Sequence, residues 1–172
     1  SFPGQGMAAS ERLSTRTCRC SGTMIEFWPR SRLYCDTNIF IYLLEGNLLL
    51  AETVGRILDV FEAAELTVVT SELAVAECLY KPAREGDAGL ISDYERLFVS
   101  GEFEILALTA GRLRSAALEG GRLGLKLLDA IHFATAIDAG CRYFLTADRR
   151  FCSAREVEVI HFDDLAEALG PP

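Results

Sequence analysis

Short β-rich runs alternate with longer helical patterns along most of this chain, and this alternation limits the folds that it can adopt. The β-rich runs occupy residues 33–35, 66–70, 103–106, 143–146 and 157–161. Apolar side chains recur at helical spacing over residues 54–61, 73–80 and 127–139. Such alternation is typical of a parallel sheet covered on both faces. The sequence therefore predicts an α/β fold with a mainly parallel central sheet of four or five strands.

Local signals mark the ends of two predicted helices. Ser71 precedes the second helical pattern and is expected to cap it, because a serine hydroxyl accepts hydrogen bonds from the first free backbone N–H groups. Gly140 follows the third pattern, where glycine readily adopts the left-handed conformation that closes a helix. In parallel α/β folds, ligands bind beyond the carboxyl ends of the strands. That edge of the sheet is the expected place for a functional site.

The first thirty residues differ in composition from the rest of the chain. They are rich in Ser, Thr, Gly and Arg, show no apolar period, and include Met7 and Met24, each of which can begin a natural protein. We expect residues 1–30 to be a disordered extension and residues 31–170 to form a single domain. A cloning tag, a mis-assigned start and an organelle transit peptide remain open explanations of the extension.

The bulk properties indicate a globular protein with no membrane span. Half of the 172 residues are apolar, so the chain can bury a substantial core. Its longest apolar runs, such as residues 39–44, are much shorter than the roughly 20 residues that cross a bilayer as a helix. We therefore expect a soluble, cytoplasmic protein. The formal net charge of -8 disfavours a broad basic surface for nucleic acid, so such binding requires positive charge gathered locally.

The six cysteines carry no recognisable motif. None lies in a C-x-x-C pair, and the chain has only 2 histidines, which disfavours a zinc site with four ligands. Several cysteines lie in apolar stretches. We therefore expect buried, reduced thiols.

Two aspartates follow directly on predicted strands. Asp36 lies in "LYCDTNIFIYLLEGN", and no lysine or arginine between Arg32 and Arg56 neutralises it. Asp148 ends "YFLTAD" in the same way. Because the carboxyl ends of parallel strands meet at one edge of a sheet, both carboxylates are expected there.

Two further acids lie on predicted helices. Asp129 is near the start of its helix, where backbone N–H groups and the helix dipole stabilise negative charge. Glu77 shares a helix face with Leu73, four positions earlier, so a charge is expected to point toward the core. Such a glutamate needs a partner. Lys81, four residues later, is one candidate, and a metal ion is another.

A cluster of four carboxylates at one edge of a sheet requires cations or protons. Two unit charges about 4 Å apart repel by about 4 kcal/mol at an effective dielectric near 20. Magnesium and manganese suit oxygen ligands and are commonly held by a few carboxylates together with substrate phosphates. One or two such ions can lower the pKa of a bound water and place it in line with a phosphorus atom. The acids therefore favour metal-dependent chemistry at phosphate.

The four acids lie in four segments: "CDTNIFIYLLE", "SELAVAECLYKP", "LKLLDAIHFATAIDAG" and "FLTADRRF". In order and approximate spacing, these segments resemble the motif regions of PIN-domain ribonucleases. The chain is most similar to VapC-type toxins of bacterial toxin-antitoxin systems, over residues 32–169. The resemblance implies that the metal is held by Asp36, Glu77, Asp129 and Asp148. It also implies that Asn38 and Thr146 are nearby polar supports.

The same resemblance implies a three-layer α/β/α sandwich and a Mg²⁺- or Mn²⁺-dependent endoribonuclease. Such enzymes hydrolyse RNA phosphodiester bonds, leave 5′-phosphate and 3′-hydroxyl ends, form homodimers and are inhibited by a cognate antitoxin. Arg149 and Arg150 follow Asp148 directly, and we expect them to contact RNA phosphates. Leucines in "GNLLLAETVGRIL", residues 46–58, are candidates to line an apolar groove for the antitoxin. Core packing or dimerisation also explains these leucines.

Two other functions remain alternatives. In a haloacid-dehalogenase-like phosphatase, Asp36 is the nucleophile, but a second aspartate is expected two residues later, where this chain has Asn38. In a catalytically inactive PIN-like binding module, the four acids need not all be retained. A dinucleotide enzyme is disfavoured because "GGRLG" at residues 120–124 lacks the G-x-G-x-x-G pattern, and we expect a loop there.

The two histidines receive no catalytic role. His132 lies three residues after Asp129, near the same helix face. A metal-bound hydroxide needs no histidine base, so we do not assign His132 that function. His161 lies in a late strand or loop, away from the acids.

Overall fold

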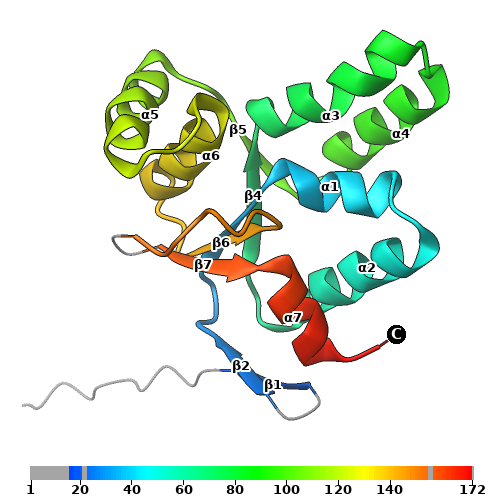
Figure 1. Cartoon of the computed structure of the whole chain (residues 1–172). Helices are drawn as coiled ribbons and strands as arrows, with labels where there is room; N and C mark the ends of the chain where they lie inside the picture. The colour runs from blue at the N-terminus through cyan, green and yellow to red at the C-terminus, as the bar shows by residue number, and fades with distance from the viewer. Residues whose placement is uncertain (1–15, 21–22, 155–156, 172) are drawn as a thin grey trace, which may run out of the picture.

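A parallel sheet of five strands forms the centre of the computed structural model, which describes residues 16–20, 23–154 and 157–171 (Figure 1). The strand order is β5-β4-β3-β6-β7, and every neighbouring pair is parallel. The strands are β3 (Arg32–Cys35), β4 (Thr67–Ser71), β5 (Glu104–Leu106), β6 (Tyr143–Thr146) and β7 (Glu158–His161). The predicted α/β class and parallel sheet are confirmed.

Helices cover both faces of this sheet, which gives three layers (Figure 1). One face carries α1 (Thr37–Leu44), α2 (Leu48–Ala63), α3 (Glu72–Glu85), α4 (Ala88–Val99) and α7 (Phe162–Leu169). The other carries α5 (Ala110–Leu123) and α6 (Leu127–Asp138). Successive strand residues alternate between these cores. Leu33 and Cys35 pack with the first group of helices, while Tyr34 packs with Phe133 of α6.

The predicted helices are present, but one cap differs from expectation. Gly140 adopts φ 67° just after α6, as predicted. Ser71 occupies the N-cap position of α3, yet its side chain makes no capping hydrogen bond. Its hydroxyl instead lies 2.7 Å from the hydroxyl of Tyr34. The fully buried serine thus pairs with a buried phenol rather than with its own helix.

The expected loop at residues 120–124 is wrong, because this segment is the last turn of α5 and its C-cap. Gly124 ends the helix with φ 67°. Gly120 faces α6 so closely that a Cβ there would lie 2.3 Å from the Cβ of Ala130. These glycines therefore serve helix closure and close helix packing.

The N-terminal extension contains two strands in its described residues, and the expectation that the extension is disordered stays a prediction. Strands β1 (Arg16–Cys20) and β2 (Thr23–Phe27) pair as an antiparallel hairpin. Phe27 is buried, with its ring 5.5 Å from that of Phe61 and 5.2 Å from that of Tyr143. The average composition of residues 1–30 gives no sign that Phe27 packs into the core. The prediction for residues 1–15 lies outside the described residues.

Two expectations about membranes and thiols are tested over the described ranges. None of the helices described there has both the length and the apolar character needed to span a membrane. Cys35, Cys78 and Cys141 are free and buried, as predicted, whereas Cys152 is free and exposed. Burial raises the pKa of the Cys141 thiol to about 11, so that thiol stays protonated at neutral pH.

Candidate active site

Asp36 and Asp148 lie at the carboxyl edge of the sheet, as predicted. Asp36 follows β3 directly, and its backbone N–H donates to the carbonyl of Leu145 in β6 at 3.0 Å. Its side chain caps α1 by accepting from the backbone N–H of Thr37 at 2.8 Å. Asp148 follows two residues after the end of β6. Parallel pairing of β3 and β6 therefore brings these two acids to the same place.

Asp36 is a buried carboxylate that the fold holds on both oxygens. It is 7% exposed, and its Oδ2 accepts from Thr146 Oγ1 at 2.7 Å. Burial raises the pKa of Asp36 above its ordinary value, although His132 and the hydrogen bond from Thr146 partly oppose this. The predicted support by Thr146 corresponds to a direct contact here.

Glu77 lies beside Asp36 and shares a histidine with it. His132 Nε2 is 2.8 Å from Glu77 Oε2 and 3.8 Å from Asp36 Oδ1. The hydroxyl of Thr37 also donates to Glu77. Burial raises the pKa of Glu77, but the hydrogen bonds from His132 and Thr37 outweigh it, so the pKa lies below its ordinary value.

The alternative partner for Glu77 is not used. Lys81 Nζ pairs with Glu45 Oε2 at 2.8 Å, so the ion pair four residues along α3 is absent from the described contacts. The core-facing glutamate predicted from the sequence is therefore satisfied by a histidine and a threonine.

Arg150 joins the other two acids. Its Nη2 lies 3.0 Å from Asp129 Oδ2. Its Nε lies 3.0 and 2.9 Å from the two carboxylate oxygens of Asp148, and its backbone N–H donates to Asp148 at 2.8 Å. These hydrogen bonds from Arg150 hold the pKa of the Asp148 carboxyl below its ordinary value. The single positive charge of Arg150 is thus shared between two carboxylates.

A continuous series of contacts connects all four acids. The backbone N–H of Asp148 donates to Thr146 Oγ1 at 3.0 Å, and Thr146 in turn donates to Asp36. His132 then leads from Asp36 to Glu77, and Arg150 leads from Asp148 to Asp129. We call Asp36 and Glu77 the inner pair, and Asp129 and Asp148 the outer pair. The four acids predicted from the sequence therefore form one connected site.

The donor chemistry of this site fits a hard divalent cation. All four groups are carboxylates with partly accessible side chains, 10% exposed for Asp36, 29% for Glu77, 24% for Asp129 and 20% for Asp148. Oxygen donors of this kind suit Mg²⁺ and Mn²⁺. In the described part of the chain, however, no three acidic, His or Cys side chains are gathered closely enough to hold a metal. Protein donors and Arg150 occupy the carboxylates instead, so a cation must compete with them.

The remaining predicted residues are placed less centrally. Asn38 is half-buried in the first turn of α1, and among the described contacts it makes no hydrogen bond to the acids. Arg149 turns toward α7, where it makes hydrogen bonds of 2.8 and 2.6 Å with Asp164. His161 is half-buried and, over the described ranges, has no contact with the four acids.

Sequence reasoning missed two contributors to the site. His132 was left without a role, yet it is 2% exposed and bridges the inner pair. Thr37 was not singled out, although it follows Asp36 directly and reaches Glu77. The position of His132, one helical turn after Asp129 on α6, was the only sequence feature that indicated its place near the acids.

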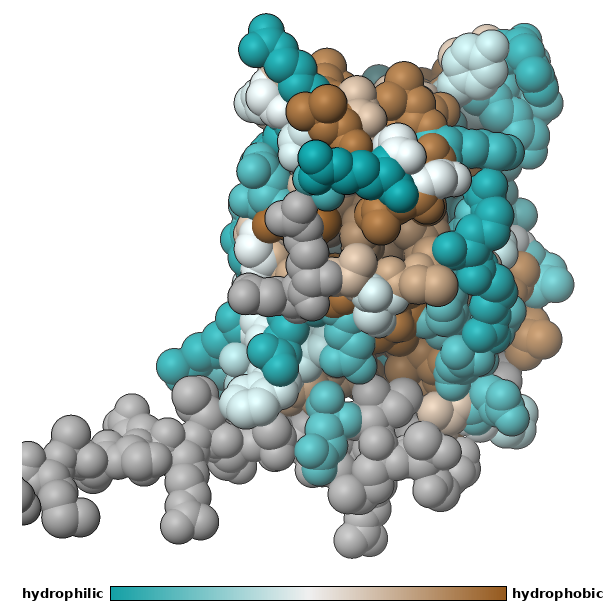
Figure 2. Space-filling view, turned by 60° about the vertical axis from the view of Figure 1, so that its left-hand side comes forward, coloured by the Kyte–Doolittle hydropathy of each residue, from teal (hydrophilic) through white to brown (hydrophobic). Residues whose placement is uncertain are grey.

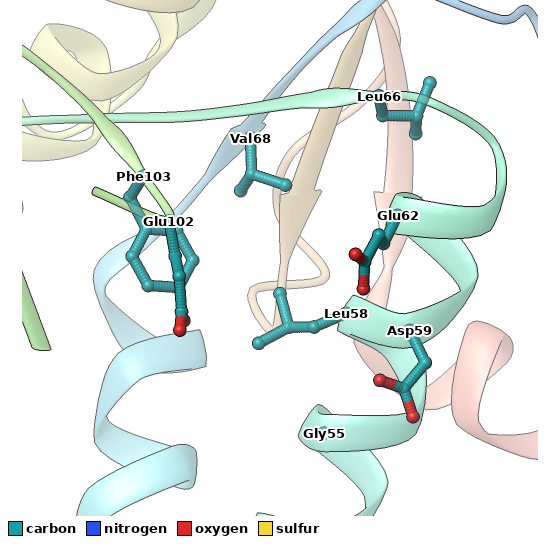
Figure 3. Close-up of a pocket in the computed structure, with 8 residues that line it drawn as sticks. All are labelled: Gly55, Leu58, Asp59, Glu62, Leu66, Val68, Glu102 and Phe103. Atoms are coloured by element: carbon teal, nitrogen blue, oxygen red, sulfur yellow. The ribbon is translucent and has the colours of Figure 1, made fainter. Parts of the chain in front are cut away.

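A separate groove lies at the opposite ends of the strands (Figure 3). Its volume is about 470 Å³, and none of the four site acids lines it. The lining consists of Gly55, Leu58, Asp59, Glu62, Leu66, Val68, Glu102 and Phe103. The carboxylates of Glu62 and Glu102 lie on opposite walls of the groove, with Leu58 between them (Figure 3). No ion pair within the described residues involves the three acids that line the groove.

Exposed apolar side chains gather over α5 and α6, at the top of the view in Figure 2. They include Leu113, Leu118, Leu123, Leu127 and Leu128. Leu127 and Leu128 immediately precede Asp129, so this apolar surface adjoins the outer pair.

Comparisons with known proteins agree with this architecture. A profile of the PIN domain matches residues 33–157, a range that contains all four acids. A search of curated protein sequences found no match. Among solved structures, VapBC2 from Rickettsia felis, bound to a DNA fragment from its promoter, is similar with a TM-score of 0.60 at 17% identity, covering 76% of this chain and 98% of that chain.

Two further solved structures share the fold. A toxin-antitoxin complex from Klebsiella pneumoniae gives a TM-score of 0.55 at 23% identity, covering 74% of this chain and 95% of that one. VapC20 from Mycobacterium tuberculosis, a toxin that cleaves the sarcin-ricin loop, gives 0.54 at 18% identity, covering 65% and 86%. With the profile match spanning most of the sheet and every acid of the site, this chain belongs to the PIN-domain family.

Proposed function

We propose that this protein is a metal-dependent endoribonuclease and the toxin of a toxin-antitoxin pair. The observation that carries the proposal is the single connected site formed by the inner and outer pairs of carboxylates at the carboxyl edge of the sheet. Membership of the PIN-domain family and the likeness in fold to toxin structures support it. The expected cation is Mg²⁺ or Mn²⁺.

The four carboxylates would hold the cation, directly or through its waters. Such a cation supplies an activated water and stabilises charge on the leaving oxygen of a phosphodiester. The chain itself sets the geometry of the inner pair, because Thr146 holds Asp36 while Thr37 and His132 hold Glu77. These contacts orient both carboxylates before any substrate arrives, and those to Glu77 also favour its ionised form.

Arg150 has a second role in this proposal. Its side chain is 54% exposed and lies on the outer pair. Where Asp129 and Asp148 hold a cation, the guanidinium of Arg150 would be released from them and could contact an RNA phosphate. Arg149 is less suited to this contact, because two hydrogen bonds commit it to Asp164.

The substrate is RNA, and hydrolysis leaves a 5′-phosphate and a 3′-hydroxyl. The expected location is the cytoplasm. The direct test incubates purified protein with a structured RNA in Mg²⁺, Mn²⁺ or EDTA, beside an Asp129→Asn variant. Discrete, metal-dependent cleavage that disappears in the variant supports the proposal. Cleavage that survives the variant, or a folded protein that cuts no RNA, contradicts it.

We assign the groove of Figure 3 to the antitoxin partner. Leu58 comes from the leucine-rich segment predicted to serve this purpose, and Leu66 and Val68 extend the apolar floor. Asp59, Glu62 and Glu102 are exposed around it, so the complementary occupant is an antitoxin segment that carries Lys or Arg among apolar side chains. Glu62→Lys should weaken antitoxin capture in a co-expression pull-down. The matched change Glu167→Lys, an exposed acid on α7, should leave it intact.

Homodimerisation remains part of the proposal, and the exposed leucines over α5 and α6 are its expected surface (Figure 2). A second copy of the chain is the proposed occupant because exposed apolar side chains gathered on one surface mark an interaction site. Light scattering of the wild type should give a dimer mass, and Leu118→Glu should give a monomer. A monomeric wild type at micromolar concentration contradicts this part.

A further inference from the structure

A buried series of hydrogen bonds leads away from Glu77 into the core. Ser71 Oγ lies 2.7 Å from Tyr34 Oη, which lies 2.8 Å from His132 Nδ1. The other ring nitrogen, Nε2, lies 2.8 Å from Glu77 Oε2. Ser71 and Tyr34 have no exposed surface, and His132 is 2% exposed. Three polar side chains from β4, β3 and α6 therefore stand behind one carboxylate of the site.

With Glu77 ionised and the imidazole of His132 neutral, the direction of each of these hydrogen bonds follows. An ionised carboxylate only accepts, so Nε2 of His132 must carry the proton that points at Glu77. In the neutral imidazole, Nδ1 is then an acceptor, and it receives the hydroxyl proton of Tyr34. The Tyr34 oxygen in turn accepts from Ser71. Ser71 thus donates to Tyr34, Tyr34 donates to His132, and His132 donates to Glu77 and orients its carboxylate.

Packing fixes the Tyr34 ring, from which the hydrogen bonds lead to His132 and Glu77. Its ring is parallel to that of Phe144 on the neighbouring strand, with centroids 5.4 Å apart and an interplanar angle of 1°. The His132 ring meets it edge-on at 5.8 Å. Because Tyr34 is in the central strand β3, the position of the imidazole is tied to the sheet itself.

His132 is not placed to act as a base toward RNA. Its Nε2 is directed at Glu77 and lies 3.2 Å from the hydroxyl of Thr37, and its Nδ1 is occupied by Tyr34. Both nitrogens are therefore engaged, and the ring is buried. The arrangement resembles the outer contacts that orient metal ligands rather than a reacting group.

We propose that Tyr34, held by Ser71, is a positioning residue that acts through His132 to orient Glu77 for cation binding. This inference rests on the proposed function, because it assigns Glu77 to a divalent cation. It adds residues that touch neither cation nor RNA. Removing the Tyr34 hydroxyl should leave the carboxylates in place but release the imidazole that fixes one of them.

The first test compares Tyr34→Phe with wild type by calorimetric titration of Mn²⁺ into metal-free protein. We expect the dissociation constant to rise by up to about tenfold, the lower end of the effect of losing a contact to a metal ligand, because Tyr34 reaches Glu77 only through His132. Tyr143→Phe is the matched control. Tyr143 is on the adjacent strand, is 1% exposed, and its hydroxyl accepts from the backbone N–H of Trp28 at 2.9 Å. This control loses a similar buried hydrogen bond away from the acids and should bind Mn²⁺ like wild type.

A second readout needs no metal. The chain has only 2 histidines, so the ring-nitrogen resonances of His132 and His161 are readily separated by NMR. Tyr34→Phe should shift the resonances of His132, and Tyr143→Phe should leave the resonances of His132 unchanged. Ser71→Ala serves as a second variant if Tyr34→Phe does not fold, with a smaller effect in the same direction.

The outcomes separate this inference from the proposed function. If the wild type binds Mn²⁺ and Tyr34→Phe binds it equally well, the positioning role is overturned while the nuclease proposal stands. If the two tyrosine variants weaken binding equally, the effect is general destabilisation and the positioning role is again overturned. If the wild type binds no Mn²⁺, both proposals fail.

Discussion

The inner and outer pairs of carboxylates solve the same electrostatic problem in different ways. Asp36 and Glu77 are held by hydroxyl groups and a buried imidazole that belong to strands and helices of the core. Asp129 and Asp148 are held by Arg150, whose side chain is 54% exposed. A contact made by the core is fixed when the chain folds, whereas an exposed arginine can leave at little cost. The difference indicates a preset inner half and an exchangeable outer half.

The largest expected effect comes from breaking the inner half. Glu77→Gln keeps the shape of the side chain but removes the charge that His132 and a cation share. We expect metal-dependent RNA cleavage to fall by more than about 100-fold, beyond the range for outer contacts. Initial rates in Mn²⁺ measure this. Glu72→Gln, an exposed acid on the same helix, is the control, and equal losses in both variants would refute the assignment.

The junction between the two halves should show a smaller loss. Thr146→Val removes the hydroxyl that donates to Asp36 and accepts from the backbone of Asp148. We expect Mn²⁺ affinity to fall about 10- to 100-fold. The matched control is Thr135→Val, because Thr135 is fully buried and its hydroxyl has no partner among the described residues.

This control carries an expectation of its own. Burying an unpaired hydroxyl costs about 1–3 kcal/mol, so Thr135→Val should raise the free energy of unfolding without changing metal affinity. Urea denaturation of both variants checks this. If Thr135→Val also lost Mn²⁺ affinity, the loss in Thr146→Val could not be attributed to its hydrogen bond to Asp36.

In the outer half we expect a gain rather than a loss. Arg150→Gln removes the guanidinium that competes with a cation for Asp129 and Asp148. An exposed ion pair stabilises only weakly, so Mn²⁺ should bind modestly more tightly. Arg149→Gln should leave affinity unchanged, because Arg149 pairs with Asp164 instead. Weaker binding in Arg150→Gln would mean that the arginine helps to form the site.

The two halves should also respond differently to pH in the absence of metal. The pKa of Asp148 is lowered by Arg150, so its contribution to stability is present above its unfolded pKa and is lost as pH falls through the lower folded pKa. The pKa of Asp36 is raised by burial, so its folded form binds a proton more readily and its ionisation destabilises the protein as pH rises. Asp36→Asn should therefore raise Tm in EDTA at pH 7, and this advantage should shrink as pH falls through the raised pKa. An unchanged Tm at pH 7 would contradict a raised pKa of Asp36 in the folded protein.

Much of this site was predictable because it follows from local rules. The end of a β-rich run placed Asp36 and Asp148 at one edge, and helix periodicity turned Glu77 inward. Contacts between distant segments were not predictable in this way. Tyr34 and His132 are 98 residues apart, and no spacing rule indicates that they meet. The pairing of Arg150 with two acids, and the burial of Phe27 outside the expected domain, likewise depend on how the elements pack.

The close packing of α5 and α6 has a consequence for the outer pair. Asp129 directly precedes Ala130, whose methyl group occupies the space that any side chain at residue 120 would need. The two helices can therefore approach this closely only because residue 120 has no side chain. A methyl group there would require α5 and α6 to separate, which would displace the start of α6 and the carboxylate that it carries. A residue outside the four acids thus acts as a spacer for the helix that carries both Asp129 and His132.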